Sequence, residues 1–360
     1  MIRHNSSDIF KINLDLQRTG KLLIAIGDSF TYGDSAWCEE LLNLYPPIYK
    51  DHQISYNHYD LEIKKKICNI YPNEIFLNNN GEFNFLQMFQ KNAYVNVLGE
   101  LLGDNWTVAN LGVCARGNFS SVSSLFMVGI NWSLVKEMTL IYMPSGMNRV
   151  DIINDEFIPS KYSSLEDLFI TAWPSPSGSR GFRESNKMLT KIHGSHQTPW
   201  NRFQDSLYDS LFSEKYEVLK TILEFQHLNT WVELHNANLI IIPAFSDYYY
   251  SEYFSKKIKM GIQREHPSRE LTNLIDNEFS VIENYVEYIP WDKIYHPHNF
   301  HSFYHYALSQ VDENSNNVNM SSLIGKPSKD NWIMSCGHPS AKSHKLMAKY
   351  IYGLIKKPII

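Results

Sequence analysis

Ser29 is the residue of this chain whose type and position are best suited to chemistry. It lies in the sequence Gly27-Asp28-Ser29, directly after the apolar run at 22–26. That run is typical of a buried strand in a parallel sheet, and Gly27 allows a sharp turn after it. Asp28 or Ser29 is suited to cap a helix that begins near Ser35. A serine at the carboxyl end of such a strand lies where open α/β sheets bind ligands, although these residues alone also fit an ordinary strand-to-helix turn.

The elements that would position Ser29 alternate between strands and helices. Short, mainly apolar segments predict buried strands at 22–26, 106–111, 138–143 and 239–244. Apolar residues at helical spacing predict helices at about 95–102, 122–126, 216–237 and 346–351. Gly103 is placed to end the first of these helices. This alternation predicts an α/β fold with a mainly parallel sheet.

The segment 27–33, Gly-Asp-Ser-Phe-Thr-Tyr-Gly, resembles the first sequence block of the SGNH (GDSL-type) hydrolases, a family of serine esterases and lipases. Later segments resemble further blocks of that family in the same order, at 110–118, 144–149 and 335–344. The resemblance implies a flavodoxin-like, three-layer α/β/α sandwich with a mainly parallel sheet. It covers the strands and turns of the core, about half of the chain.

The resemblance also implies one domain over residues 1–360 that carries large loop insertions. These insertions match nothing in the family and lie at about 48–90, 151–215 and 248–330. The first is a candidate for part of a substrate wall or, equally, an elaborated surface loop. We expect the last to pack over or beside the site.

By the same resemblance, four residues have catalytic roles. Ser29 would be the nucleophile, and His338, in His338-Pro339, would be the general base. The backbone N–H of Gly117 and the side-chain amide of Asn148 would donate to the oxyanion. Gly112 is the less suitable glycine for that role. The implied activity is a metal-independent esterase that needs no cofactor.

Two positions depart from the family pattern. The residue three before His338 is Ser335, where the family has the aspartate that orients the histidine. Asp247 and Asp330 are the candidates to replace that acid. Arg149 stands where the third block has an aspartate, and it would contact an anionic group of the substrate or pair with a nearby carboxylate.

Composition limits the classes of partner. The 360 residues carry a net charge of −5, with 64–66 as the one notable basic run, so we expect no nucleic-acid partner. The four scattered cysteines predict neither a disulfide framework nor a metal site. His193 and His196 have a glycine between them and no adjacent acid, so no metal is expected there either. We expect cytoplasmic synthesis without a signal peptide, and no membrane span.

The substrate is predicted from the aromatic content and from the absence of an apolar lid. Aromatic residues make up 14% of the chain, which favours a polar substrate on which rings can stack. O-acetyl groups on a carbohydrate are therefore the first candidate, and a lipid or an acyl thioester is the second. The alternative, given the missing acid, is a catalytically weak or inactive SGNH-like structural or glycan-binding component, for instance of a phage particle. Such a component would associate with an oligomer or a virion.

Overall fold

The computed structural model describes residues 3–5, 9–33, 36, 92–113, 117–145, 150–153, 169–172, 214–245, 288–311, 328, 330, 332–333 and 338–356. The insertion predicted at 48–90 lies outside the described residues. The insertions predicted at 151–215 and 248–330 lie partly within them.

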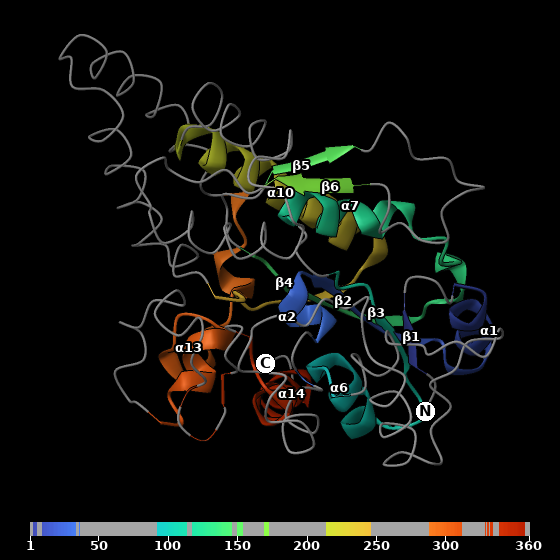
Figure 1. Ribbon diagram of the computed structural model, residues 1–360. Helices are drawn as coiled ribbons and strands as arrows, with labels where there is room; N and C mark the ends of the chain where they lie inside the picture. Colours follow the sequence, from blue (N-terminus) through green and yellow to red (C-terminus); the bar gives the residue numbers. More distant parts are fainter. Residues whose placement is uncertain are drawn as a thin grey trace, which may run out of the picture.

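A five-stranded parallel sheet forms the centre of the described part of the chain (Figure 1). Its strands, in spatial order, are β1 (Arg3–Asn5), β3 (Thr107–Asn110), β2 (Lys21–Gly27), β4 (Glu137–Met143) and β7 (Asn238–Ile241). β2 and β4 pair along the full length of both strands, from Lys21 opposite Glu137 to Gly27 opposite Met143. The four predicted strands are confirmed, and β1 adds a strand at the edge of the sheet, before the first predicted strand.

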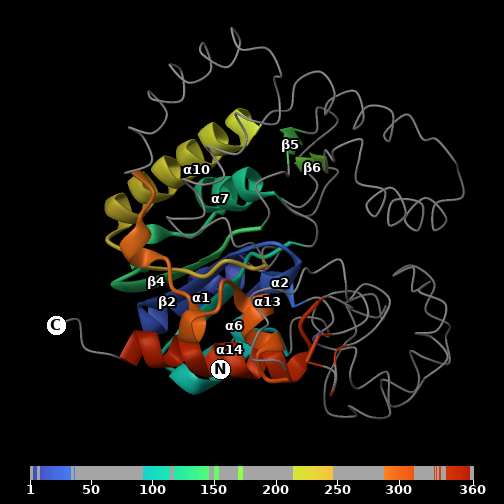
Figure 2. The same cartoon turned by 90° about the vertical axis from the view of Figure 1, so that its left-hand side faces the viewer.

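Helices cover both faces of this sheet. Cores on the two faces are built from alternate residues of β2, with Leu22 and Ile24 on one side and Leu23 and Ala25 on the other. On the first side lie α1 (Ile9–Thr19), α7 (Asn118–Met127) and α10 (Glu214–His235). On the second side lie α6 (Tyr94–Leu102), α13 (Phe303–Leu308) and α14 (Ala341–Lys356). Figure 2 shows α7 and α10 on one side of β2 and β4, and α6 and α14 on the other. The predicted α/β class is confirmed.

Part of the range predicted as the insertion at 248–330 belongs to the core. Residues 288–311 follow the carboxyl end of β7 and include α13. The N–H groups of Phe303 and Tyr304 donate to the carbonyls of Pro243 and Ala244, at 2.9 and 3.0 Å. Both aromatic side chains are fully buried. This segment therefore continues the packing of the sheet on the side of α14.

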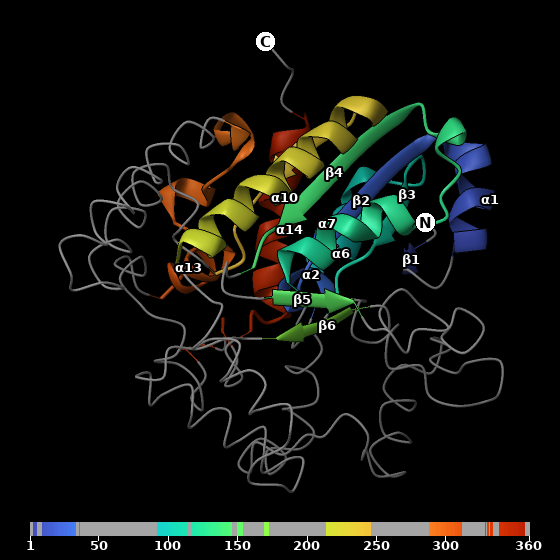
Figure 3. The same ribbon diagram turned by 90° about the horizontal axis from the view of Figure 1, so that it is seen from above.

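The range predicted as the insertion at 151–215 contains a small antiparallel pair of strands. β5 (Val150–Ile153) pairs with β6 (Phe169–Ala172). Figure 3 looks onto α10 and α7 and shows this pair beyond the carboxyl ends of β2 and β4. Among the described helices, none is both long enough and apolar enough to cross a bilayer.

Candidate active site

The structure brings Ser29 and His338 into hydrogen-bond contact across 309 residues of sequence. Nε2 of His338 lies 2.8 Å from Oγ of Ser29. Ser29 begins the short helix α2 (Ser29–Tyr32) at the carboxyl end of β2, and His338 lies just before α14. A distance of about 2.6–3.2 Å is the one that a serine nucleophile needs from its histidine base. The pair therefore has the geometry for removal of the serine proton.

The turn that carries Ser29 is closed by Asp28. Its Oδ1 accepts a hydrogen bond from the N–H of Phe30 at 3.0 Å, so Asp28 is the N-cap of α2. Gly33, at φ 92°, ends the helix after one turn in the left-handed conformation. Asp28 therefore caps a one-turn helix that begins at Ser29 itself, while the helix expected to begin near Ser35 lies outside the described residues.

The end of β3 and the loop that follows it pack against this turn and form hydrogen bonds with it. Nδ2 of Asn110 donates to the carbonyl of Thr31 at 2.9 Å, and its Oδ1 accepts from the N–H of Gly112 at 3.0 Å. A Cβ atom on Gly112 would lie 2.5 Å from the backbone nitrogen of Tyr32. Gly112 therefore permits close contact between this loop and the turn of Ser29. The family pattern does not assign Asn110 a role, and the structure gives it one.

The ring of Phe30 packs against the imidazole of His338 and is itself supported by two further aromatic rings. The ring of Phe30 lies 5.4 Å from that of His338, centroid to centroid, at a tilt of 48°. Phe30 in turn contacts Phe245 and Phe303, with centroids 5.4 and 6.1 Å apart. Phe30 is the residue directly after Ser29, so one helical turn carries the nucleophile and packs against the base.

A second histidine, His344, is fully buried beneath this site. Its Nδ1 accepts a hydrogen bond from the N–H of Tyr94 at 3.1 Å, so the neutral ring carries its proton on Nε2. Nε2 has no hydrogen-bond partner among the described residues. Burial, together with the nearby His338, lowers the pKa of His344 to about 3. The imidazole of His344 is therefore neutral at pH 7.

We expect His344 to make the protein less stable in mild acid. In the unfolded chain its pKa is near 6.5, so below that pH the unfolded state takes up a proton that the folded state does not. The free energy of unfolding should fall by about 2 kcal/mol from this group between pH 7 and pH 5. Urea denaturation at several pH values measures this change. His344→Gln should flatten the dependence, because the variant has no imidazole at this position to take up the proton.

Gly117 lies at the N-terminus of α7, at the same edge of the sheet as Ser29. Its carbonyl faces into the helix and accepts from Oγ of Ser120 and from Oγ of Ser121, at 3.2 and 2.8 Å. The N-terminus of a helix of ten residues carries partial positive charge and favours a nearby anion. The position of Gly117 therefore suits a residue that stabilises negative charge.

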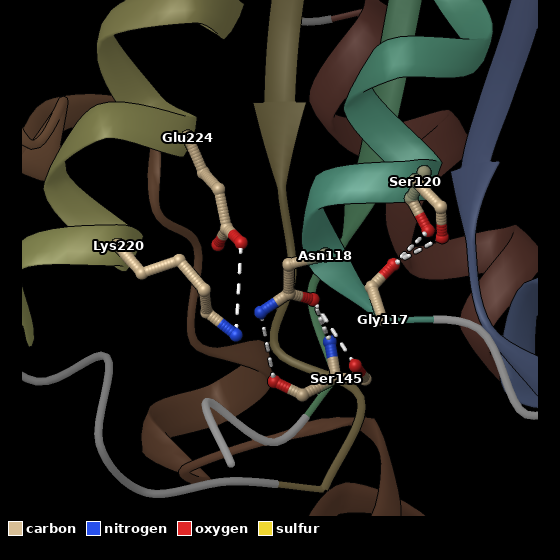
Figure 4. Close-up of polar contacts among 7 residues, drawn as sticks. Gly117, Asn118, Ser120, Ser145, Lys220 and Glu224 are labelled. Carbon is tan, nitrogen blue, oxygen red and sulfur yellow. Dashed lines mark hydrogen bonds and ion pairs between the residues drawn. The ribbon is translucent and has the colours of Figure 1, made fainter. Parts of the chain in front are cut away.

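Asn118 and Ser145 form a buried clamp next to Gly117 (Figure 4). Oδ1 of Asn118 accepts from the backbone N–H of Ser145 at 2.8 Å and from its Oγ at 3.1 Å. Nδ2 of Asn118 donates to the carbonyl of Ser145 at 3.4 Å. Lys220 and Glu224 of α10, whose charged groups lie 3.9 Å apart, extend toward the same clamp. The residue pattern gave no indication of this cluster, because its members come from three separate elements.

Of the remaining predicted site residues, the structure describes only Asp330. Asn148, Arg149 and Asp247 lie outside the described residues, and their roles stay predictions. Asp330 is exposed and has φ 57°. Between the described residues Asp330 and His338 there is no hydrogen bond or ion pair, so the structure does not bring this candidate acid to the imidazole.

No group of three or more His, Cys, Asp or Glu side chains within the described part of the chain is arranged to hold a metal ion. Comparison with known protein families, with curated proteins and with solved structures finds no match for this chain. The interpretation of the site therefore depends on the sequence resemblance and on the geometry given above.

Proposed function

We propose that this chain is an SGNH-type serine esterase with Ser29 as nucleophile and His338 as general base. The observation that carries the proposal is the 2.8 Å contact between Oγ of Ser29 and Nε2 of His338 at the carboxyl edge of the sheet. A serine directly after a strand and a histidine directly before the last helix are also the positions that the resemblance implies. The geometry and the sequence resemblance thus support the same pair of residues.

The order of the strands supports the proposed fold type. Numbered along the chain from β2, the four central strands have the spatial order 2-1-3-4. Ile294 bridges to Ile241 of β7 in parallel and continues the order to a fifth position. Flavodoxin-like sheets with the order 2-1-3-4-5 bind ligands at the carboxyl ends of the strands, where the chain changes direction beside the first strand. Ser29 follows that first strand.

In the proposed reaction, Oγ of Ser29 attacks the ester carbonyl carbon while Nε2 of His338 takes the serine proton. The N–H of Gly117 and the amide of Asn148 would donate to the oxyanion of the tetrahedral intermediate. His338 then gives its proton to the leaving alcohol. In the second half, His338 takes a proton from water, the resulting hydroxide attacks the acyl group, and Ser29 is released with its proton restored.

O-acetyl groups on a carbohydrate are the substrate that we propose first, and a lipid or an acyl thioester comes second. The proposal rests on the aromatic share of the chain and on the partly exposed ring of Phe245, which packs against Phe30 of the turn that carries Ser29. Acetate release from an acetylated glycan, compared with hydrolysis of p-nitrophenyl palmitate, separates the two. A short-chain enzyme should act on the first and on p-nitrophenyl acetate but hardly on the second.

The test of the activity itself is reaction of the wild-type chain with a fluorophosphonate probe, followed by peptide mapping. We expect the probe on Ser29, together with hydrolysis of p-nitrophenyl acetate. A well-folded protein that neither reacts with the probe nor hydrolyses any ester would overturn the proposal. That result would favour a structural or glycan-binding component that retains the hydrolase fold.

A further inference from the structure

The clamp between Asn118 and Ser145 joins the two segments of chain that carry the proposed oxyanion donors. Asn118 directly follows Gly117, whose N–H is one proposed donor. Ser145 lies two residues beyond the end of β4, and Asn148, the other proposed donor, is three residues further along the chain. Three residues of chain span at most about 11 Å. The clamp is therefore close in the chain to both donors.

The side chain of Asn118 is used across the fold and not within its own helix. Asparagine at the start of a helix commonly caps that helix with its side chain. Here the N-cap is Gly117, which provides no side-chain cap, and the Asn118 amide instead pairs with both backbone groups of Ser145. The carbonyl of Gly117 is held separately by Ser120 and Ser121. The local stability of the helix end therefore does not explain the contact with Ser145.

Burial strengthens the hydrogen bonds between Asn118 and Ser145, so they can hold the segment after β4 in place against α7. Asn118 is 2% exposed and Ser145 is 1% exposed. Hydrogen bonds shielded from water are stronger than exposed ones, and leaving buried partners unpaired costs about 1–3 kcal/mol each. Any shift of the segment after β4 relative to α7 would break them. Three hydrogen bonds of one buried amide thus tie the segment after β4 to the start of α7.

We infer that Asn118 is a positioning residue: it holds the segment after β4, which leads to the proposed donor Asn148, against the start of α7, where the proposed donor Gly117 lies. This inference rests on the proposed esterase function. Oxyanion donors act only when they lie about 2.7–3.1 Å from the oxyanion, and a misplacement of about 1 Å can cost on the order of 100-fold in rate. Asn118 does not touch the substrate and acts through Gly117 and Asn148.

The experiment compares steady-state kinetics of Asn118→Leu, Asn118→Asp and Ser145→Ala with wild type. Asn118→Leu removes the three hydrogen bonds to Ser145 at similar volume and should lower kcat about 10- to 100-fold, with KM within about twofold. Asn118→Asp keeps the oxygen that accepts from Ser145 and should lose less. Ser145→Ala removes only the Oγ donor and should lose least of the three.

Ser124→Ala is the matched control. Oγ of Ser124 donates to the carbonyl of Ser121 at 2.6 Å in the same helix, away from both Gly117 and Ser145. This variant should keep the kcat of wild type even if it loses some stability. Urea denaturation of all variants measures stability separately from kcat, and inhibition by an alkyl boronic acid reports binding of the tetrahedral state.

The outcomes separate the two proposals. A fall in kcat that follows weaker boronic acid binding across the series, with the control unaffected, supports the positioning role. An active wild type together with a folded Asn118→Leu of undiminished kcat would overturn that role and leave the esterase intact. If Ser124→Ala lost as much kcat as Asn118→Leu, general loosening of α7 would be the cause and the inference would be wrong. Absence of any wild-type activity would remove both proposals.

Discussion

Ser29→Ala should lower the rate of ester hydrolysis by about 10⁴-fold or more, and His338→Ala should lower it by a similar factor. The hydroxyl of Ser29 forms the bond to the acyl group, and its 2.8 Å contact with Nε2 of His338 is the path for its proton. Because the two side chains act as one unit, the double variant should be no slower than the slower single variant. Hydrolysis of p-nitrophenyl acetate by the three variants measures these rates.

The chain contains a second serine–histidine contact that serves as a control. Oγ of Ser302 lies 2.6 Å from Nδ1 of His305, and both residues are buried. Ser302 also accepts from the N–H of His305, so it caps α13, and its loss should cost about 1 kcal/mol of stability. Ser302→Ala should therefore keep its activity and its labelling. If instead Ser302→Ala lost both and Ser29→Ala kept both, the nucleophile would be Ser302.

The central strands could be predicted because burial on both faces requires continuous apolar sequence. β2, β4 and β7 contain such runs, whereas β3, Thr-Val-Ala-Asn, is fully buried although it begins and ends on a polar residue. β1 is different, since its residues are Arg3, His4 and Asn5 and it forms a strand by pairing with β3 at the edge. Pairing at an edge depends on tertiary position and leaves no apolar pattern in three residues.

α13 shows the same limit for helices. Its six residues, Phe-Tyr-His-Tyr-Ala-Leu, are all buried and so show no amphipathic period. The signal that the sequence does contain is Ser302 as N-cap, with His305 three residues later. A helix enclosed on all sides cannot be found from a pattern that contrasts a buried face with an exposed one.

The candidate site was predictable in part. The pairing of Ser29 with His338 follows from matching blocks, since no periodicity connects residues 309 positions apart. Asn118, Ser145 and His344 were missed because each acts through tertiary contact. His344, for example, reads as one polar residue of an otherwise amphipathic helix, and only the structure shows that it is fully buried against Tyr94.

Gly112→Ala should destabilise the protein by about 3 kcal/mol or more and should also slow the folded enzyme. The added Cβ would lie 2.5 Å from the nitrogen of Tyr32 and 2.8 Å from the carbonyl carbon of Thr31. Both are backbone atoms of the turn that begins at Ser29, so they can move away only if the turn shifts. Such a shift would disturb the contact between Ser29 and His338.

Gly353→Ala is the matched control for this prediction. Gly353 lies exposed in α14, and a Cβ there would meet nothing within 4 Å. Alanine at that position should raise the free energy of unfolding by about 0.5–1 kcal/mol, because glycine weakens a helix interior, and should leave kcat unchanged. Urea denaturation and kcat measured on both variants test the pair. Wild-type stability and rate in Gly112→Ala would contradict the prediction. They would mean that the loop after β3 can move to make room for the Cβ without cost, and that it does not support the turn of Ser29.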